Sequence, residues 1–254
     1  MNAGDPVTLR SSCANYDFLQ TDLTPLYNRP SLLVPANALI DIQHASRSVL
    51  HLNKDYVVVY DRATSLHAGL FKRFNLNFTV PPVLNTNYNL LTETTPHGQQ
   101  LFVQTLLPTN PTYHWVSAPG AVTHIAETEP TVGRVVVEDS NNPANIRFLH
   151  VLQASDPSGS MLPSTLVQSF AGNPFDGAAF GSNLVLFAKD LTVPFTGTAY
   201  TAPATATTHY VTGLVPGASY SIAEQLDASG NVQVALTPGG NLTADAAGVL
   251  LFNP

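Results

Sequence analysis

The chain has 254 residues, of which 44% are hydrophobic and only 11% are charged, and its formal net charge is −7. This acidic balance, together with the absence of any basic run, argues against nucleic acid or an anionic membrane surface as the main partner. The single cysteine, Cys13, excludes a disulfide bond within the chain.

Targeting signals are not evident in the sequence. The first residues, MNAGDPVTLRSSC, contain no apolar core of the kind that signal peptides have. No apolar run is long enough to form a membrane-spanning helix. We therefore expect either a protein that stays inside the cell or a form of the chain from which a targeting segment has been lost, and the compartment stays open.

Strand patterns extend along the whole chain. In short segments apolar and polar residues alternate, or β-branched and aromatic residues follow one another, and Pro, Gly, Asn and Ser turns separate these segments. The predicted strands are 16–19, 46–52, 56–60, 70–80, 88–92, 100–107, 123–125, 133–138, 147–153, 166–170, 178–180, 183–187, 199–200, 209–212, 220–225, 232–237 and 248–252. Residues 63–69 are predicted to be a loop.

This pattern predicts an all-β fold, a large antiparallel β-sandwich of many short strands with little or no helix. We expect a single β-sandwich domain over residues 1–254. The chain from about residue 190 is richer in Ala, Gly and Thr, and it is expected to form either a second layer of the same body or a satellite sandwich.

Residues 41–78 hold the densest group of His, Asp, Arg and Lys in the chain. They form three consecutive predicted strands, and if these strands are neighbours, His44, Asp61 and Asn77 converge on one face. Two histidines and a carboxylate would suit Zn²⁺ with an open position; Asn77 is a poor zinc ligand, and His67 in the predicted loop is the alternative second histidine. The alternative is that His44 is a polar residue at a strand edge and that Asp61 accepts from Arg62 or Arg47.

Tyr113, His114 and Trp115 form the best candidate for binding a sugar. An exposed aromatic ring offers an apolar face to sugar CH groups, while polar neighbours bind the hydroxyls. Ordinary core or rim packing is the alternative for these rings. The basic residues expected to contribute to substrate binding are Arg62, Lys72 and Arg73.

Other chemistries find less support. The segment 217–221 (GASYS) falls short of the serine-hydrolase motif and leads into a predicted strand, and no phosphate-binding glycine motif occurs. Glu138 and Asp139 point to opposite faces of a strand, so they are not a natural acid–base pair. Glu127 and Glu129 are better explained as a solvated strand edge.

Seven segments occur in an order and spacing that extend through nearly the whole chain. They are residues 22–28 (DLTPLYN), 44–63 (HASRSVLHLNKDYVVVYDRA), 71–76 (FKRFNL), 95–108 (TPHGQQLFVQTLLP), 147–153 (RFLHVLQ), 209–220 (HYVTGLVPGASY) and 248–252 (GVLLF). Together they resemble the C-terminal β-sandwich of heparinase II/III-like polysaccharide lyases and their bacterial relatives.

The resemblance implies a two-part enzyme plan. Such lyases carry an N-terminal α/α toroid with a catalytic Tyr and His, and the β-sandwich closes one wall of the cleft. This sequence has too few helical residues for a toroid, so the catalytic residues have no counterpart here. Some members bind zinc in the sandwich through a His, an Asp and a second His. His44 and Asp61 match the first two of these positions, and Asn77 stands at the third.

Three functional hypotheses follow. The first is a glycan-associated sandwich, similar to the accessory domain of such a lyase, that binds or shapes a cleft for uronate polysaccharides beside an N-terminal toroid domain or as a homo-oligomer. The second is a carbohydrate-active enzyme in its own right, a lyase or a metal-dependent enzyme with its site near His44 and Asp61. The third is a structural or oligomerisation module.

Overall fold

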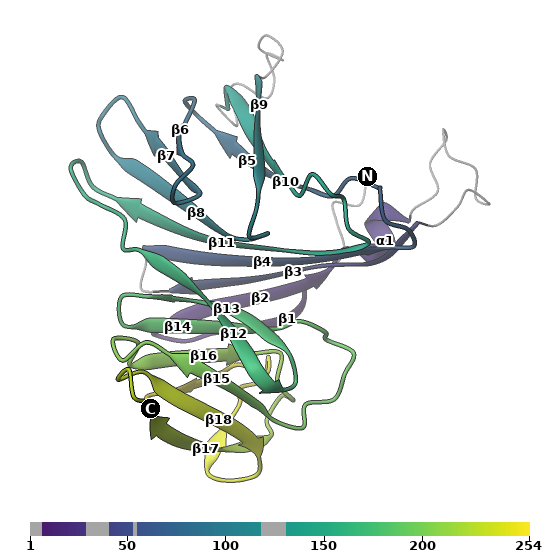
Figure 1. Ribbon diagram of the computed structural model, residues 1–254, viewed down its shortest axis with the longest axis vertical. Coiled ribbons are helices and arrows are strands. Elements are labelled where there is room, and N and C mark those ends of the chain that lie inside the picture. The colour runs from purple at the N-terminus through teal and green to yellow at the C-terminus, as the bar shows by residue number, and fades with distance from the viewer. Residues whose placement is uncertain (1–6, 29–40, 53–54, 118–130) are drawn as a thin grey trace. The chain divides into compact units, whose positions relative to one another are not determined.

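The computed structural model describes residues 7–28, 41–52, 55–117 and 131–254 (Figure 1). Within these residues the chain is built from strands, and the only helix among them is the single turn α1 (Thr24–Tyr27). The predicted all-β class is therefore confirmed. The predicted strand 123–125 and the Glu127/Glu129 pair lie outside the described residues. No helix in the described part of the chain is long and apolar enough to span a membrane.

The strands form three sheets (Figure 1). The eight-stranded sheet has the order β1 (Val7–Ser12), β2 (Tyr16–Asp22), β3 (Ile42–Leu52), β4 (Tyr56–Ser65), β11 (Asn145–Ser155), β8 (Gln100–Leu107), β7 (Leu90–Thr94) and β6 (Val83–Asn85). The three-stranded sheet has the order β5 (Arg73–Phe78), β10 (Gly133–Glu138) and β9 (Thr112–Ser117).

The third sheet has nine strands. Its order is β19 (Leu242–Thr243), β17 (Ser219–Leu226), β18 (Val232–Pro238), β15 (Thr198–Ala202), β12 (Ser164–Gly172), β13 (Phe175–Phe180), β14 (Asn183–Ala188), β16 (Thr208–Thr212) and β20 (Leu250–Phe252). Most of its neighbouring strands pair in antiparallel fashion, and some of these pairs are hairpins, as between β13 and β14. The strands β14 and β16 are parallel instead. The strand that lies between them in the sequence, β15, pairs with β12 and β18 elsewhere in the sheet.

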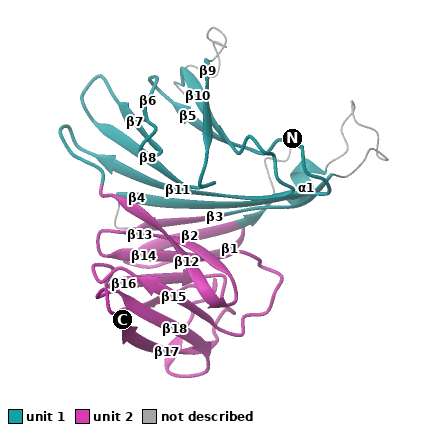
Figure 2. Cartoon of the chain, viewed as in Figure 1, with its two compact units in different colours: residues 1–6, 21–47, 53–161 teal, residues 7–20, 48–52, 162–254 magenta. Residues whose placement is uncertain are grey.

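The chain divides into two compact units (Figure 2). Unit 1 comprises residues 1–6, 21–47 and 53–161, and unit 2 comprises residues 7–20, 48–52 and 162–254. The sequence suggested one domain with a change of character from about residue 190. In the structure the division in the second half falls between Met161 and Leu162.

Unit 1 has its core between the three-stranded sheet and the strands β4, β11 and β8. Phe74 of β5 packs on two rings of β11, with its centroid 6.0 Å from that of Phe148 and 4.1 Å from that of His150. Val135 and Val137 of β10 are also buried. The alternation of apolar and polar residues along β5 explains this arrangement, since it gives the strand one buried face and one exposed face.

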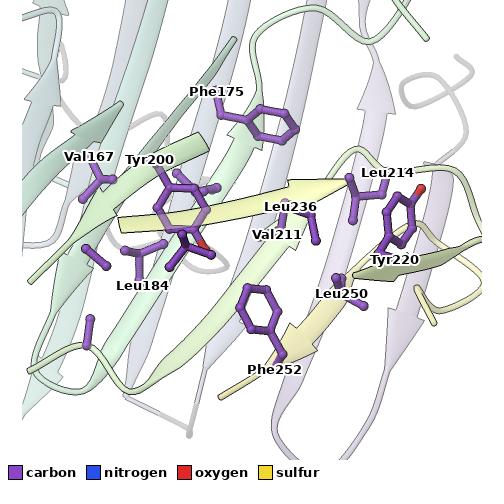
Figure 3. Close-up of a cluster of buried hydrophobic side chains, with 14 of the residues drawn as sticks. Val167, Phe175, Leu184, Tyr200, Val211, Leu214, Tyr220, Leu236, Leu250 and Phe252 are labelled. Atoms are coloured by element: carbon purple, nitrogen blue, oxygen red, sulfur yellow. The ribbon is translucent and has the colours of Figure 1, made fainter. Parts of the chain in front are cut away.

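Unit 2 has a separate core on the nine-stranded sheet (Figure 3). Every residue of β14 is buried, as its continuous apolar run NLVLFA predicts for a strand covered on both faces. The Tyr200 ring lies in this core, and its hydroxyl group donates to His209 Nδ1 at 2.7 Å. His209 Nε2 donates to the Ala206 carbonyl oxygen at 3.1 Å, so both ring nitrogens of this buried histidine are satisfied.

One predicted loop was wrong at its start. Residues 63–65 were assigned to a loop, but β4 continues to Ser65. The reason is tertiary pairing, because Ala63 and Thr64 lie opposite Ile146 and Asn145 of β11. Neither residue forces a turn, so the strand continues for as long as its partner does.

Candidate functional site

Asp61 is engaged by an arginine. Arg47 of β3 donates from Nε and Nη2 to the two carboxylate oxygens of Asp61 on β4, each at 2.7 Å. The Arg47 guanidinium carbon also lies 4.9 Å from the centre of the Phe74 ring. Burial raises the pKa of Asp61, while the hydrogen bonds from Arg47 act in the opposite direction. The pKa of Arg47 is raised by its hydrogen bond to Asp61, so this contact favours the charged form of the guanidinium group.

The structure does not bring His44, Asp61 and Asn77 together. His44 and Arg47 are three residues apart on one strand, so they point to opposite faces of the sheet, and Asp61 shares the face of Arg47. His44 Nε2 lies 2.9 Å from the Ser46 hydroxyl group on its own face. Asn77 is exposed on β5, which belongs to a different sheet.

These three residues therefore do not form the tetrahedral ligand set that zinc requires. Across residues 7–28, 41–52, 55–117 and 131–254, no group of three or more His, Cys, Asp or Glu side chains could hold a metal ion. The expected neighbourhood of three consecutive strands holds for β3 and β4, but β5 pairs with β10 instead.

Two of the three basic residues expected to bind substrate are buried. Arg62 has its guanidinium carbon 4.5 Å from the centre of the Tyr60 ring. Lys72 Nζ donates to the carbonyl oxygens of Leu70 at 3.1 Å and Pro143 at 2.8 Å, and burial lowers its pKa. Lys72 therefore ties two loops together and does not face solvent.

The aromatic cluster divides between the two faces of the three-stranded sheet. Tyr113 and Trp115 lie opposite Val137 and Val135 and share their inner face, whereas His114 lies opposite Val136 on the outer face. This separation follows from strand alternation, since the three residues are consecutive on β9. The cluster is therefore not a single sugar-stacking surface.

Trp115 covers a glycine of the neighbouring strand. A β-carbon at Gly133 would lie 2.5 Å from the Trp115 ring and 2.7 Å from the Val116 carbonyl oxygen. The indole thus occupies the space that a side chain would fill, and the ring stays 39% exposed at the edge of the sheet. Packing on Gly133 is the role that the structure shows for this residue.

Tyr113 belongs to a hydrogen-bonded chain inside unit 1. The Tyr113 hydroxyl group donates to the Asn89 carbonyl oxygen at 3.4 Å and interacts with Thr105, whose Oγ1 lies 3.1 Å from His150 Nδ1. Burial raises the pKa of Tyr113 to about 12 and lowers the pKa of His150 to about 3. Both groups are therefore neutral at physiological pH, as expected of a polar chain in an apolar core.

The outer face of the three-stranded sheet gathers polar side chains from all three strands. We call this surface the outer polar face, and its residues are Arg73, Asn75 and Asn77 of β5, Arg134, Val136 and Glu138 of β10, and Thr112, His114 and Val116 of β9. Paired residues of antiparallel strands point to the same side, which places these nine residues together. Val136 at the centre is buried, whereas the Arg, Asn and His residues around it are exposed.

A carboxylate bridges an arginine and a histidine side chain on this face. Arg73 Nε donates to Glu138 Oε2 at 2.7 Å, and His114 Nε2 lies 3.1 Å from Glu138 Oε1. The Arg73 guanidinium carbon lies 4.4 Å from the centre of the Phe71 ring, which is 66% exposed. Arg134, at the other end of the face, has no ion-pair partner within the described part of the chain. The surface thus combines guanidinium groups, planar amides and an exposed aromatic ring.

Sequence reasoning missed Arg134 and reached Glu138 only as half of a carboxylate pair. The signal was present in the predicted strand 133–138 (GRVVVE), where alternation puts Arg134 and Glu138 on one face. It could not show which strands lie beside this one. The partners Arg73 and His114 come from strands that are far apart in the sequence.

Comparison with known proteins gives a likeness of fold. No family model matches the chain, and no curated protein matches its sequence. Heparan sulfate lyase HepC from Pedobacter heparinus is similar in structure, with a TM-score of 0.51 and 19% identity over 71% of this chain and 27% of that chain. A structure of heparinase III has a TM-score of 0.50 and 11% identity over 72% of this chain and 26% of that chain.

The chain thus spans about a quarter of the length of these solved structures, since the matched region is 27% of the HepC chain. A further heparinase III structure, with 9% identity and a TM-score of 0.51, matches the same share of its own length. At these identities the comparison shows the fold. The chain has the β fold of part of the heparinase III-like lyase structures, as its sequence resemblance predicted.

Proposed function

We propose that this chain is a lyase-related β module that binds acidic polysaccharides on its outer polar face. The observation that carries the proposal is the convergence of Arg73, His114 and Arg134 from three strands on one exposed surface. The chain as a whole is acidic, with a formal net charge of −7, so this concentration of basic groups is local.

The chemistry of the face suits an acidic glycan. Guanidinium groups bind carboxylates and sulfates with directed, charge-assisted hydrogen bonds. The exposed amides of Asn75 and Asn77 supply donors and acceptors for sugar hydroxyls. Phe71 offers an aromatic ring beside Arg73, and such a ring contacts the apolar face of a sugar. A flat sheet face with these groups fits an extended chain better than a small enclosed ligand.

The comparisons support the ligand class and suggest a partner. The similar structures include a heparan sulfate lyase, so an acidic polysaccharide is the first ligand to test. The matched region makes up only about a quarter of those chains. In this proposal the module holds the polysaccharide beside a catalytic domain, and elimination chemistry belongs to that domain.

Calorimetric titration with a heparan sulfate hexasaccharide tests the proposal. We expect the wild-type chain to bind it and the variant Arg73→Ala/Arg134→Ala to bind at least about tenfold more weakly, since each lost contact involves a charged group. Arg10→Ala, which removes an exposed cation of unit 2, is the control and should keep the wild-type affinity. Neutral maltohexaose should bind weakly to all forms. Equal binding by the wild type and the double variant would overturn this assignment.

A further inference from the structure

Glu138 occupies the centre of the cationic part of the outer polar face. Resting on the proposed function, we infer that Glu138 is an intramolecular competitor of the ligand: its carboxylate fills the anion position between Arg73 and His114, and an acidic group of the glycan must displace it. Glu138 is thus a specificity-determining residue that weakens binding of acidic ligands and leaves neutral ligands unaffected.

The contact geometry supports this role. The two oxygens of Glu138 are used separately, Oε2 by Arg73 Nε at 2.7 Å and Oε1 by His114 Nε2 at 3.1 Å. A free carboxylate or sulfate group presents the same pair of oxygens at similar spacing. The arginine and histidine side chains therefore hold a carboxylate in a position that an external anion could also take.

The exposure of the three side chains supports exchange. The side chains of Arg73 and His114 are 47% and 59% exposed, whereas that of Glu138 is 15% exposed. The cationic groups thus reach into solvent and the carboxylate lies lower between them. A ligand approaching from solvent therefore meets Arg73 and His114 before it meets Glu138.

Glu138 lowers the net positive charge of the outer polar face. The charged groups are Arg73, Arg134 and Glu138, with His114 as a further cation when it is protonated. With His114 neutral, Glu138 halves the net positive charge of the face, which would be two without it and is one with it. Exchange of one exposed ion pair for another changes the free energy of binding little, because exposed ion pairs are weak. Wild-type affinity for an acidic ligand is therefore kept low by its own carboxylate.

The test is the variant Glu138→Gln, which keeps the shape of the side chain and removes its charge. Calorimetric titration at low salt compares this variant with the wild type, using the heparan sulfate hexasaccharide and neutral maltohexaose as probes. We expect binding of the acidic probe to tighten by about three- to tenfold, which is the effect of one or two exposed ion pairs. Binding of the neutral probe should not change.

The control removes a negative charge elsewhere in unit 1. Asp156 is exposed and lies outside the outer polar face, so Asp156→Asn changes the net charge by the same amount. An equal gain in Asp156→Asn would assign the effect to overall charge and overturn the inference. So would a Glu138→Gln variant that binds the acidic probe no more tightly than wild type. An equal gain for maltohexaose would point to a change of shape and would also overturn it.

The outcomes separate this inference from the proposed function. If the acidic probe binds and depends on Arg73 and Arg134, but Glu138→Gln gives no gain, only the role of Glu138 fails. If neither the wild type nor Glu138→Gln binds, the proposed function fails and the competitor role fails with it. Glu138→Thr, whose β-branched side chain suits a strand, provides a second uncharged variant with the same expected gain if Glu138→Gln does not fold.

Discussion

Arg47 and Asp61 form a two-contact salt bridge between neighbouring strands, and the Arg47 guanidinium group also lies against the Phe74 ring. The pair lies within the eight-stranded sheet, and Arg47 contacts the three-stranded sheet through Phe74 of β5. Each residue of the pair neutralises the charge of the other. Removing one of them therefore leaves a partly buried charge without an opposite charge beside it.

We expect Asp61→Asn to lower the free energy of unfolding by about 1–3 kcal/mol, less than for a fully buried pair because Arg47 is partly exposed. Urea denaturation measures this change. The double variant Arg47→Met/Asp61→Asn should recover part of the loss, since it removes the uncompensated arginine. If the double variant loses as much free energy of unfolding as Arg47→Met and Asp61→Asn lose together, the two residues are not coupled.

The same pair predicts the response to metal removal. Asp61 is bound by Arg47, and His44 points to the other face of the sheet, so the described residues around them form no zinc ligand set. Dialysis against a chelator should leave the thermal unfolding midpoint unchanged, and elemental analysis should find no stoichiometric zinc. A fall in the midpoint that added zinc reverses would contradict this prediction.

Buried histidines predict a loss of stability in mild acid. Burial lowers the pKa of His209 to about 4 and that of His150 to about 3, so both stay neutral in the folded chain while they protonate in the unfolded chain below about pH 6.5. Their contribution to stability is complete above that pH and is lost progressively as the pH falls towards the folded pKa values. Protonation of His209 alone should lower the free energy of unfolding by roughly 3 kcal/mol as the pH falls from about 7 to about 4.

Urea denaturation across that pH range measures the slope of stability against pH. The variant His209→Gln should show a shallower slope than the wild type, because one titrating group has been removed. The carboxylates are the same in both proteins, so the difference between the two slopes reports the titration of His209. An unchanged slope would mean that His209 is not buried as a neutral group.

Lys72 predicts a structural effect at a position that the sequence assigned to binding. Lys72→Met removes the hydrogen bonds to the Leu70 and Pro143 carbonyl oxygens, which should cost about 2 kcal/mol of stability. Hydrogen exchange should become faster at the Gly69 amide, which donates to Asn142 across the same two loops. Arg10→Met, which removes an exposed cation elsewhere, should change neither quantity.

Gly133 and Trp115 predict a packing effect that is distinct from ligand binding. Gly133→Ala would place a methyl group against the Trp115 ring and the Val116 carbonyl oxygen, and we expect a loss of about 1–3 kcal/mol. Trp115→Ala in the same chain should relieve the contact with the ring but not the contact with the backbone oxygen. A double variant as stable as Trp115→Ala alone would show that the ring is the whole obstacle.

The sequence predicted strands well where alternation or a β-branched run was strong. The predicted bounds 100–107 and 133–138 agree with β8 and β10 in the structure. It missed β9, although Tyr113, His114 and Trp115 alternate between apolar and polar, because so short a run does not show its pairing with β10. It also placed Arg62 and Lys72 at the surface, although their charges are compensated inside by a ring and by carbonyl oxygens.

Pairing between distant strands was beyond sequence reasoning for the same reason. Local patterns predict which side chains alternate, but they do not show that β10 lies between β5 and β9. The candidate metal set assumed that consecutive strands are neighbours, which holds for β3 and β4 and fails at β5. The contacts of Glu138 with Arg73 and His114 could be seen only in the structure, because they depend on which strands lie beside β10.

The position of β10 at the centre of the three-stranded sheet has a consequence for folding. Arg73 and Glu138 are 65 residues apart in the sequence, so a long loop must close before they meet. Hairpins such as β13 and β14 join neighbouring segments and can form early, whereas contacts of long range form slowly. The outer polar face therefore arises late during folding, and no peptide cut from a single strand should reproduce it.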